Sequence, residues 1–167
     1  MDCVLFRHGI AADQEDWDGP DAKRPLTPRG MEKTAVSAEG LTRLEIEPSH
    51  MWSSSLTRAL QTAKILQEIF RFPAEIHITD ALHPEAAPER LLEALGRLPK
   101  DACVICVGHQ PNLGEVAGVS LFGGPVMGLG LKKAGACCVR FNGPVKPGEG
   151  VLRWWLAPSQ LRQLAKG

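Results

Sequence analysis

The segment Arg7-His8-Gly9 directly follows an apolar run, Val4-Leu5-Phe6, near the start of the chain. A guanidinium binds phosphate oxygens through two parallel N–H donors and keeps its charge at every working pH. An imidazole with one free ring nitrogen is a nucleophile toward phosphorus when its other nitrogen holds its proton against a backbone carbonyl. Gly9 allows the tight turn that brings backbone close to such a ring. These residue types in this order suggest phosphoryl transfer.

Two further segments supply a second arginine and a second histidine. Arg58 follows Ser53-Ser54-Ser55 in the first turn of an expected helix, where the helix dipole disfavours a cation unless an anion lies nearby. His109 follows the apolar stretch 102–107. In its cationic form, His109 would balance the charge that spreads over the phosphate oxygens in the transition state. The four side chains therefore predict a covalent phosphohistidine mechanism that requires no metal and no other cofactor.

Strand-like and helix-like segments alternate along the chain, which predicts an α/β fold around a largely parallel sheet. Strands are expected at 2–7, 50–54, 75–79, 102–107, 135–142 and 150–156, and helices at 28–44, 56–70 and 88–98 and from residues 112 and 158. Thr27 is expected to cap the first helix, with Pro28 in its first turn. Residues 9–26 are polar, contain Gly and Pro, and predict a long surface loop.

The four candidate residues lie at the carboxyl ends of predicted strands or in the segments that directly follow them. The carboxyl ends of parallel strands share one sheet edge, and ligands bind in the crevice outside it. Taken singly, Arg7 is better explained as a surface cation or a salt-bridge partner, and His8 is also explained as a strand cap and His109 as a turn residue. Their joint placement predicts one shared site, to which the helix N-termini after Ser54 and near Asn112 would add backbone donors.

Length and composition restrict the class of protein. The 167 residues predict one domain over 1–167, and 19 Lys and Arg balance 19 Asp and Glu. Net neutrality gives no reason to expect nucleic acid or an anionic membrane as partner. The N-terminus has no signal-peptide pattern, so a cytoplasmic location is expected. The five cysteines lie in apolar runs and are expected to be buried reduced thiols.

Three motifs in order resemble the histidine phosphatase superfamily, also called phosphoglycerate-mutase-like. These motifs are FRHG at 6–9, SSSLTRALQTA at 53–63 and VGHQPNL at 107–113. The stretch KRPLTPRG at 23–30 further resembles the small SixA-type phosphohistidine phosphatases. The resemblance implies a three-layer α/β/α sandwich around a mostly parallel sheet. It also implies His8 as the nucleophile, with Arg7, Arg58 and His109 forming the phosphate pocket.

Arg24 is either a further phosphate-binding residue or a solvated loop cation. The general acid that many members of this superfamily use is also open in this sequence. Glu85 is the best candidate, and Asp13, Glu15 and Asp16 in the long loop are alternatives. All four are equally explained as solvated loop carboxylates.

The leading hypothesis is a metal-independent phosphatase that acts on phosphohistidine in a protein. An imidazole leaving group titrates near pH ~6.5 and needs protonation far less than an alkoxide does, so such a site requires no dedicated acid. The short chain has no long insertion that would form a lid, which favours a protein substrate. The alternatives are a phosphatase for small phosphate monoesters and a non-catalytic phosphate-binding module.

Overall fold

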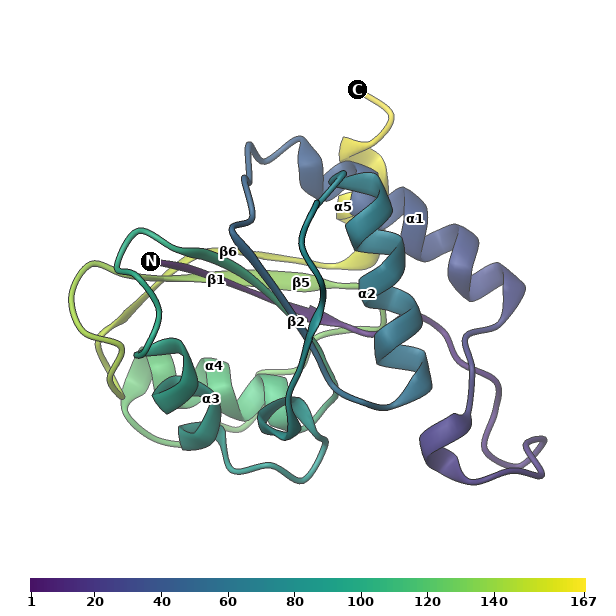
Figure 1. Cartoon of the computed structure of the whole chain (residues 1–167), viewed down its shortest axis with the longest axis horizontal. Helices are drawn as coiled ribbons and strands as arrows, with labels where there is room; N and C mark the ends of the chain where they lie inside the picture. Colours follow the sequence, from purple (N-terminus) through teal and green to yellow (C-terminus); the bar gives the residue numbers. More distant parts are fainter.

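A six-stranded sheet forms the middle layer of the computed structural model, which describes residues 1–167 (Figure 1). The strands are β1 (Asp2–Arg7), β2 (His50–Ser53), β3 (His77–Ile78), β4 (Cys103–Gly108), β5 (Ala136–Phe141) and β6 (Gly150–Leu156), in the spatial order β3-β2-β4-β1-β5-β6. The pairs β1–β4, β2–β4 and β2–β3 are parallel, whereas β5 is antiparallel to both β1 and β6. Only β5 therefore opposes the common strand direction, and the expected mostly parallel sheet is confirmed.

Helices cover both faces of the sheet. They are α1 (Pro28–Thr42), α2 (Thr57–Ile69), α3 (Pro88–Leu95), α4 (Asn112–Phe122) and α5 (Pro158–Leu164), together with short 3-10 turns at Asp21–Lys23 and Asp80–Leu82. Figure 1 shows α1, α2 and α5 on one side of the sheet and α3 and α4 on the other. This arrangement is the three-layer α/β/α fold that the sequence predicts. None of the five helices is both long and apolar enough to span a membrane.

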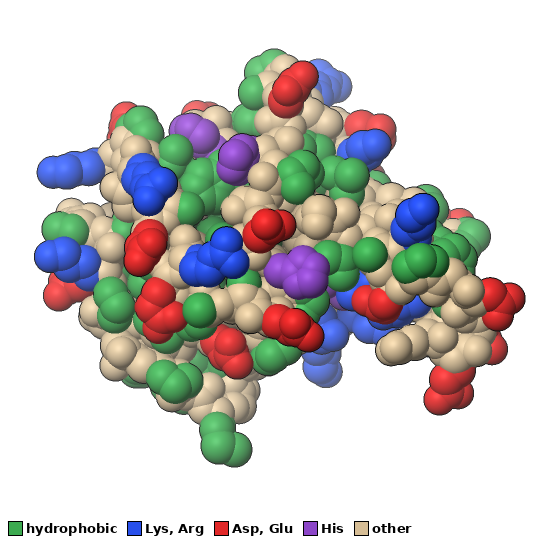
Figure 2. All heavy atoms as spheres, turned by 60° about the horizontal axis from the view of Figure 1, so that its bottom comes forward, with side chains coloured by type: hydrophobic (Ala, Val, Ile, Leu, Met, Phe, Trp, Pro, Cys, Tyr) green, Lys and Arg blue, Asp and Glu red, His purple; other side chains and the backbone are tan.

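The two hydrophobic cores follow the alternation of side chains along the strands. In β1, Val4 and Phe6 pack with α1, α2 and α5, whereas Cys3 and Leu5 pack with α3 and α4. The central strands are buried on both faces, which is why their sequences are continuous apolar runs. The outer surface of the α3–α4 side, which faces forward in Figure 2, carries interspersed acidic and basic side chains.

Local signals explain where most elements begin and end. The Thr27 hydroxyl accepts a hydrogen bond from the Gly30 N–H at 2.9 Å and caps α1, with Pro28 in the first turn, as expected. The predicted strand at 75–79 is shorter than expected, because only residues 77 and 78 of this exposed edge segment pair with β2. The predicted helix over 88–98 ends at Leu95, before Gly96, a residue with low helix propensity.

Candidate active site

The register of two central strands places His8 and His109 side by side. Arg7 at the end of β1 pairs with Gly108 at the end of β4, and the His8 N–H donates to the Gly108 carbonyl at 3.0 Å. The centroids of the two imidazole rings are 5.0 Å apart and the rings are inclined by 53°. The strand ends that the sequence places at one sheet edge thus bring the two histidines together.

The His8 side chain has one occupied and one free ring nitrogen. Its Nδ1 lies 2.7 Å from the Gly9 carbonyl oxygen and donates to it, which leaves Nε2 as the nitrogen with a free lone pair. Burial lowers the pKa of His8 to about 3, against the hydrogen bond to Gly9 and together with the charges of Arg58, Arg7 and Lys133. The imidazole is therefore neutral at physiological pH, as a nucleophile must be.

Gly9 is required here because a side chain has no space. A Cβ at this position would run into the Thr34 hydroxyl, and Gly9 does not adopt a positive φ. Its N–H donates to the Thr62 hydroxyl of α2 at 3.0 Å. The backbone around His8 is thereby fixed to the neighbouring helix.

His109 is held by Ser54, which follows β2. His109 Nε2 lies 2.9 Å from the Ser54 hydroxyl, and that hydroxyl accepts the Leu56 N–H at 3.3 Å. We assign the Ser54 proton to His109 Nε2, which places the imidazole proton on Nδ1, a buried atom with no partner in the protein. Burial, followed by the charges of His8 and Arg58, lowers the pKa of His109 to about 2. Before an anion binds, His109 is therefore a neutral donor rather than the cation that the sequence suggested.

Arg7 and Arg58 each present an unpaired donor. Arg7 Nη1 donates to the Leu131 carbonyl at 2.8 Å, and Arg58 is buried at the start of α2. The Nε atoms of both guanidiniums are buried and have no partner. Burial lowers the pKa of both arginines from the ordinary value. Two cations with unused N–H groups beside two neutral imidazoles form a site suited to a phosphate dianion.

Asp21 is a site residue that sequence reasoning missed. Its carboxylate lies 3.1 Å from Arg58 Nη2 and 2.9 Å from Arg24 Nε, and its backbone carbonyl accepts Arg58 Nη1 at 2.9 Å. The helix dipole disfavours a cation such as Arg58 in the first turn of α2, and the Asp21 carboxylate is the anion that compensates for it. Burial acts to raise the pKa of Asp21, but Arg24 and Arg58 outweigh it and hold the pKa below its ordinary value. Asp21 and Arg24 are spaced at i and i+3, and this spacing is the feature of the sequence that could have predicted their ion pair.

Arg24 belongs to the edge of this site. It binds Asp21, donates to the Ala12 carbonyl at 2.7 Å, and is linked to Arg58 only through Asp21. Its side chain therefore supports the 10–26 loop around the pocket, and the structure shows no direct contact of Arg24 with either histidine.

The four carboxylates that the sequence offers as general acids are exposed, whereas His8 and His109 are buried. Glu85 is exposed and lines a hollow with Asp80, His83 and Arg90, and the charge of His83 acts on His109. The loop carboxylates Asp13, Glu15 and Asp16 are exposed, and none takes part in an ion pair. Asp21 is the carboxylate that contacts the arginines of the pocket.

Three further polar residues hold the loops around the site. Thr62 joins Gly9 to α2, Gln61 accepts the Leu26 N–H at 2.7 Å, and Asn112 donates to the Ala86 carbonyl at 2.8 Å. At the start of α4, the Leu113 and Gly114 N–H groups bond to the His109 carbonyl and the Gln110 side chain. These two N–H groups are thus unavailable as the anion donors expected near Asn112.

The cysteines lie away from this chemistry. All five are free, four are buried and Cys103 is half-buried, as the sequence predicts. Burial raises the pKa of Cys103 to about 11 and that of Cys137 well above its ordinary value, so both remain thiols. No three His, Cys, Asp or Glu side chains gather as a set of metal ligands.

The fold and the arrangement of two histidines and two arginines suit a phosphate-binding α/β protein. Residues 3–86, half of the chain, match the model of the histidine phosphatase superfamily, branch 1. The chain is also 39% identical over 142 residues to an uncharacterized protein of Picosynechococcus, covering 84% of this chain and 85% of that protein. The chain belongs to the histidine phosphatase superfamily, and this membership supports phosphatase activity.

Solved structures share the whole fold. The protein histidine phosphatase SixA complexed with tungstate has a TM-score of 0.82 at 24% identity and covers 96% of this chain and 99% of that chain. A putative phosphohistidine phosphatase SixA from Agrobacterium tumefaciens has a TM-score of 0.76 at 21% identity, with 94% and 97% coverage. A phosphoserine phosphatase mutant from Entamoeba histolytica, complexed with phosphoserine, has a TM-score of 0.69 at 17% identity, with 96% and 98% coverage. These similarities establish a phosphoglycerate-mutase-like fold of the SixA kind.

Proposed function

We propose that this protein hydrolyses phosphohistidine on a protein substrate through a covalent phosphohistidine at His8. The observation that carries the proposal is the hydrogen bond from His8 Nδ1 to the Gly9 carbonyl at 2.7 Å. It fixes the tautomer whose free Nε2 is the nucleophile, and burial keeps that nitrogen unprotonated. The likeness of the fold to SixA structures supports the same substrate class.

The reaction has two steps. His8 Nε2 attacks phosphorus, the new P–N bond forms, and the bond to the leaving imidazole breaks as that imidazole takes a proton from water. A water molecule then attacks the phosphoenzyme and the P–N bond to His8 breaks, which releases inorganic phosphate and restores neutral His8. The proton that this water loses neutralises the hydroxide left by the first step. Arg7 and Arg58 hold the phosphate through their unpaired Nε–H groups, and His109 donates from Nδ1 to a phosphate oxygen.

The carboxylates near the site favour a leaving group that does not depend on a strong general acid. Asp21 is paired with two arginines and its pKa is lowered, so it is ionised at neutral pH and has no proton to give. Glu85 is exposed and forms no ion pair with a residue of the site. Phosphohistidine suits such a site because imidazole, with a pKa near ~6.5, leaves far more readily than an alkoxide.

A phosphatase for small phosphate monoesters is the second candidate. The fold likeness to the phosphoserine phosphatase of Entamoeba histolytica supports it. The rates of hydrolysis of a phosphohistidine protein, phosphoserine and sugar phosphates distinguish the two candidate functions. Faster hydrolysis of the esters, lost in Glu85→Gln, would establish the ester phosphatase instead.

Trapping of the phosphoenzyme tests the mechanism directly. Rapid quenching with a radiolabelled phosphohistidine protein should leave a label on the enzyme that is acid-labile and base-stable. The label should disappear in His8→Ala and persist in the matched variant His77→Ala, which changes an exposed histidine of β3. Turnover should be unaffected by chelators. Absence of a label with every phosphorylated substrate would favour a non-catalytic phosphate-binding module.

A further inference from the structure

A hollow of about 450 Å³ beside the phosphate pocket is lined by five cations: Arg7, Lys33, Lys132, Lys133 and Arg162. No Asp or Glu lines it. We call it the cationic hollow. Since the chain as a whole carries 19 basic and 19 acidic residues, this local excess is not a general property of the surface. An anion entering the phosphate pocket past Arg7 would have this hollow directly beside it.

The backbone fixes two of these lysines against the catalytic strand. The Gly135 N–H donates to the Lys132 carbonyl at 2.8 Å, which closes a tight turn over residues 132–135. The Ala134 N–H donates to the carbonyls of Arg7 and His8, both at 3.1 Å. Ala134 adopts a φ of 61°, an unusual conformation for alanine that this turn imposes. Lys132 and Lys133 therefore start from a fixed position beside His8.

The other wall of the cationic hollow comes from two packed helices. Lys33 lies on α1 and Arg162 on α5, and the two helices touch so closely that a Cβ at Gly40 would run into the Leu161 carbonyl. The ion pairs of the protein involve Arg24, Arg58 and Arg140, and no cation of the hollow takes part in one. The charge of Lys133 also contributes to the lowered pKa of His8, which shows that the hollow and the pocket share one field.

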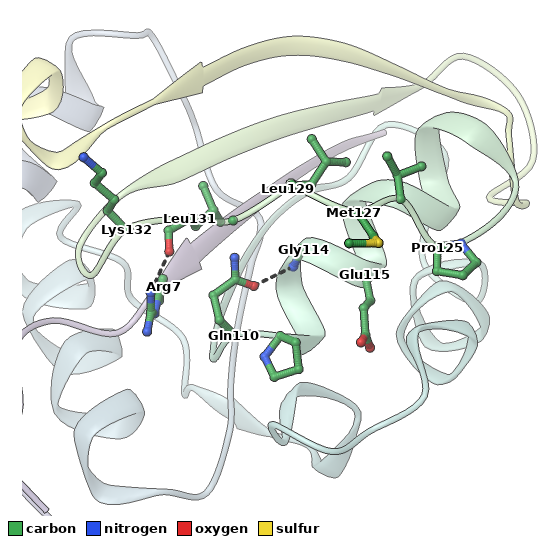
Figure 3. A pocket seen from close by; sticks show the side chains of 13 residues that line it. Arg7, Gln110, Gly114, Glu115, Pro125, Met127, Leu129, Leu131 and Lys132 are labelled. Atoms are coloured by element: carbon green, nitrogen blue, oxygen red, sulfur yellow. Dashed lines mark hydrogen bonds between the residues drawn. The ribbon is translucent and has the colours of Figure 1, made fainter.

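A second hollow, of about 720 Å³, lies on the other side of Arg7 and Lys132 (Figure 3). We call it the apolar groove; its walls include Pro111, Pro125, Met127 and Leu129, and Gln110 and Glu115 also line it. The Met127 side chain is 98% exposed. In Figure 3, Arg7 lies at one end of the groove, and Lys132 points away from Met127 and Pro125. Arg7 thus lies between the cationic hollow and this groove.

We propose that the cationic hollow binds carboxylate side chains that flank the phosphohistidine of an acidic protein substrate. The proposal rests on the proposed function. Carboxylates of a protein fit the observations better than a second phosphate of a small molecule. Three of the five cations are lysines, which act as mobile point charges, whereas a dedicated phosphate site favours arginine forks. A protein surface would also cover the apolar groove, which a small anion would leave exposed to water.

Two peptides of equal length test this inference. Each carries one histidine phosphorylated with phosphoramidate, and the flanking residues are Glu in one and Gln in the other. The ratio of their kcat/KM values is measured for the wild type, for Lys33→Gln/Lys133→Gln/Arg162→Gln, and for the control Lys64→Gln/Arg97→Gln/Lys146→Gln. The control changes three exposed cations outside the cationic hollow. Melting temperatures establish that each variant is folded.

We expect the wild type and the control to prefer the Glu peptide about tenfold at low salt, and the preference to decline in about 0.3 M salt. The hollow variant should hydrolyse both peptides with a ratio near one.

Equal efficiencies in the wild type, or a preference that survives in the hollow variant, would overturn the inference and leave the proposed function intact. A small bisphosphate favoured over its monophosphate, with loss in the hollow variant, would replace it with a phosphate subsite. Hydrolysis of p-nitrophenyl phosphate but of neither peptide would instead refute the proposed function.

Discussion

Asp21 is the residue that sets the net charge of the phosphate pocket before substrate binds. Its carboxylate contacts Arg24 and Arg58 and therefore already balances part of the positive charge of these two arginines. Its backbone carbonyl holds Arg58 independently of the side chain. The side chain is therefore separable from the position of the guanidinium, and its charge is open to a direct test.

We expect Asp21→Asn to bind inorganic phosphate more tightly than the wild type. The amide retains an acceptor for the arginines but removes the negative charge, and the partial exposure of Asp21 limits the gain to about three- to tenfold. The inhibition constant of phosphate, measured against substrate turnover, gives the result. Asp13→Asn removes one charge from the same loop outside any ion pair and is the control. An unchanged or weaker affinity would show that Asp21 acts mainly by positioning Arg58.

The four central residues could be predicted because each follows directly from a strand or opens a helix. Arg7, His8 and His109 extend from buried strands, so the strand register alone brings them together. Asp21 lies in a loop, where neither periodicity nor register gives a side-chain direction. The charge state of His109 also could not be predicted, because it depends on how deeply the folded chain buries the ring.

At the scale of elements, α2 supports the turn that carries His8. The buried Thr62 hydroxyl accepts the Gly9 N–H at 3.0 Å and donates to the Arg58 carbonyl at 2.8 Å. The Thr62 side chain thus links Gly9, which follows the carboxyl end of β1, to the first turn of α2, which carries Arg58. This link gives Thr62 a structural role within the motif at 53–63.

Thr62→Val should destabilise the protein and lower kcat. Valine has the same shape but leaves the buried Gly9 N–H without an acceptor, at a cost of about 1–3 kcal/mol. Urea unfolding gives the free energy, and turnover of a phosphohistidine protein gives kcat. Thr62→Ser keeps the hydroxyl and should retain more of both than Thr62→Val does. Equal behaviour of the two variants would mean that the hydroxyl link is not needed.

The elements themselves were largely predictable because their signals are local. Thr27 and Pro28 mark the start of α1, and continuous apolar runs mark β1 and β4. The length of β3 could not be predicted, because it depends on how far β2 extends beside it. The cations of the hollow lie on separate elements, so no local signal in the sequence groups them.

At the scale of the whole molecule, the strand order is what creates the site. β1 and β4 are distant in sequence but adjacent at the centre of the sheet, with β2 on the far side of β4. The parallel direction was predictable from the alternation of strands and helices, whereas the order was not, because it depends on packing between helices on both faces. The same packing buries both histidines of the candidate site in their neutral form, and that burial has a cost for the fold in acid.

We expect the stability of the protein to fall as the pH drops below about 7. The native pKa values of His8 and His109 are about 3 and about 2, whereas an unfolded histidine titrates near ~6.5. Between about pH 6.5 and 3, the unfolded chain binds protons that the native chain does not, so the free energy of unfolding decreases with decreasing pH. From about pH 7.5 to 5, the loss is on the order of 2 kcal/mol for each histidine.

Carboxylates do not account for a loss in this range. The lowered pKa values of Asp2 and Asp21 affect stability only as the pH approaches and passes below the ordinary value of 3.8. Urea unfolding at several pH values measures the effect, and His109→Gln should remove about half of the slope, whereas the exposed His77→Gln should retain it. A free energy of unfolding that stays constant from about pH 7.5 to 5 would show that the native histidines take up protons. In that case the neutral nucleophile on which the proposed mechanism depends would be absent below pH ~6.5.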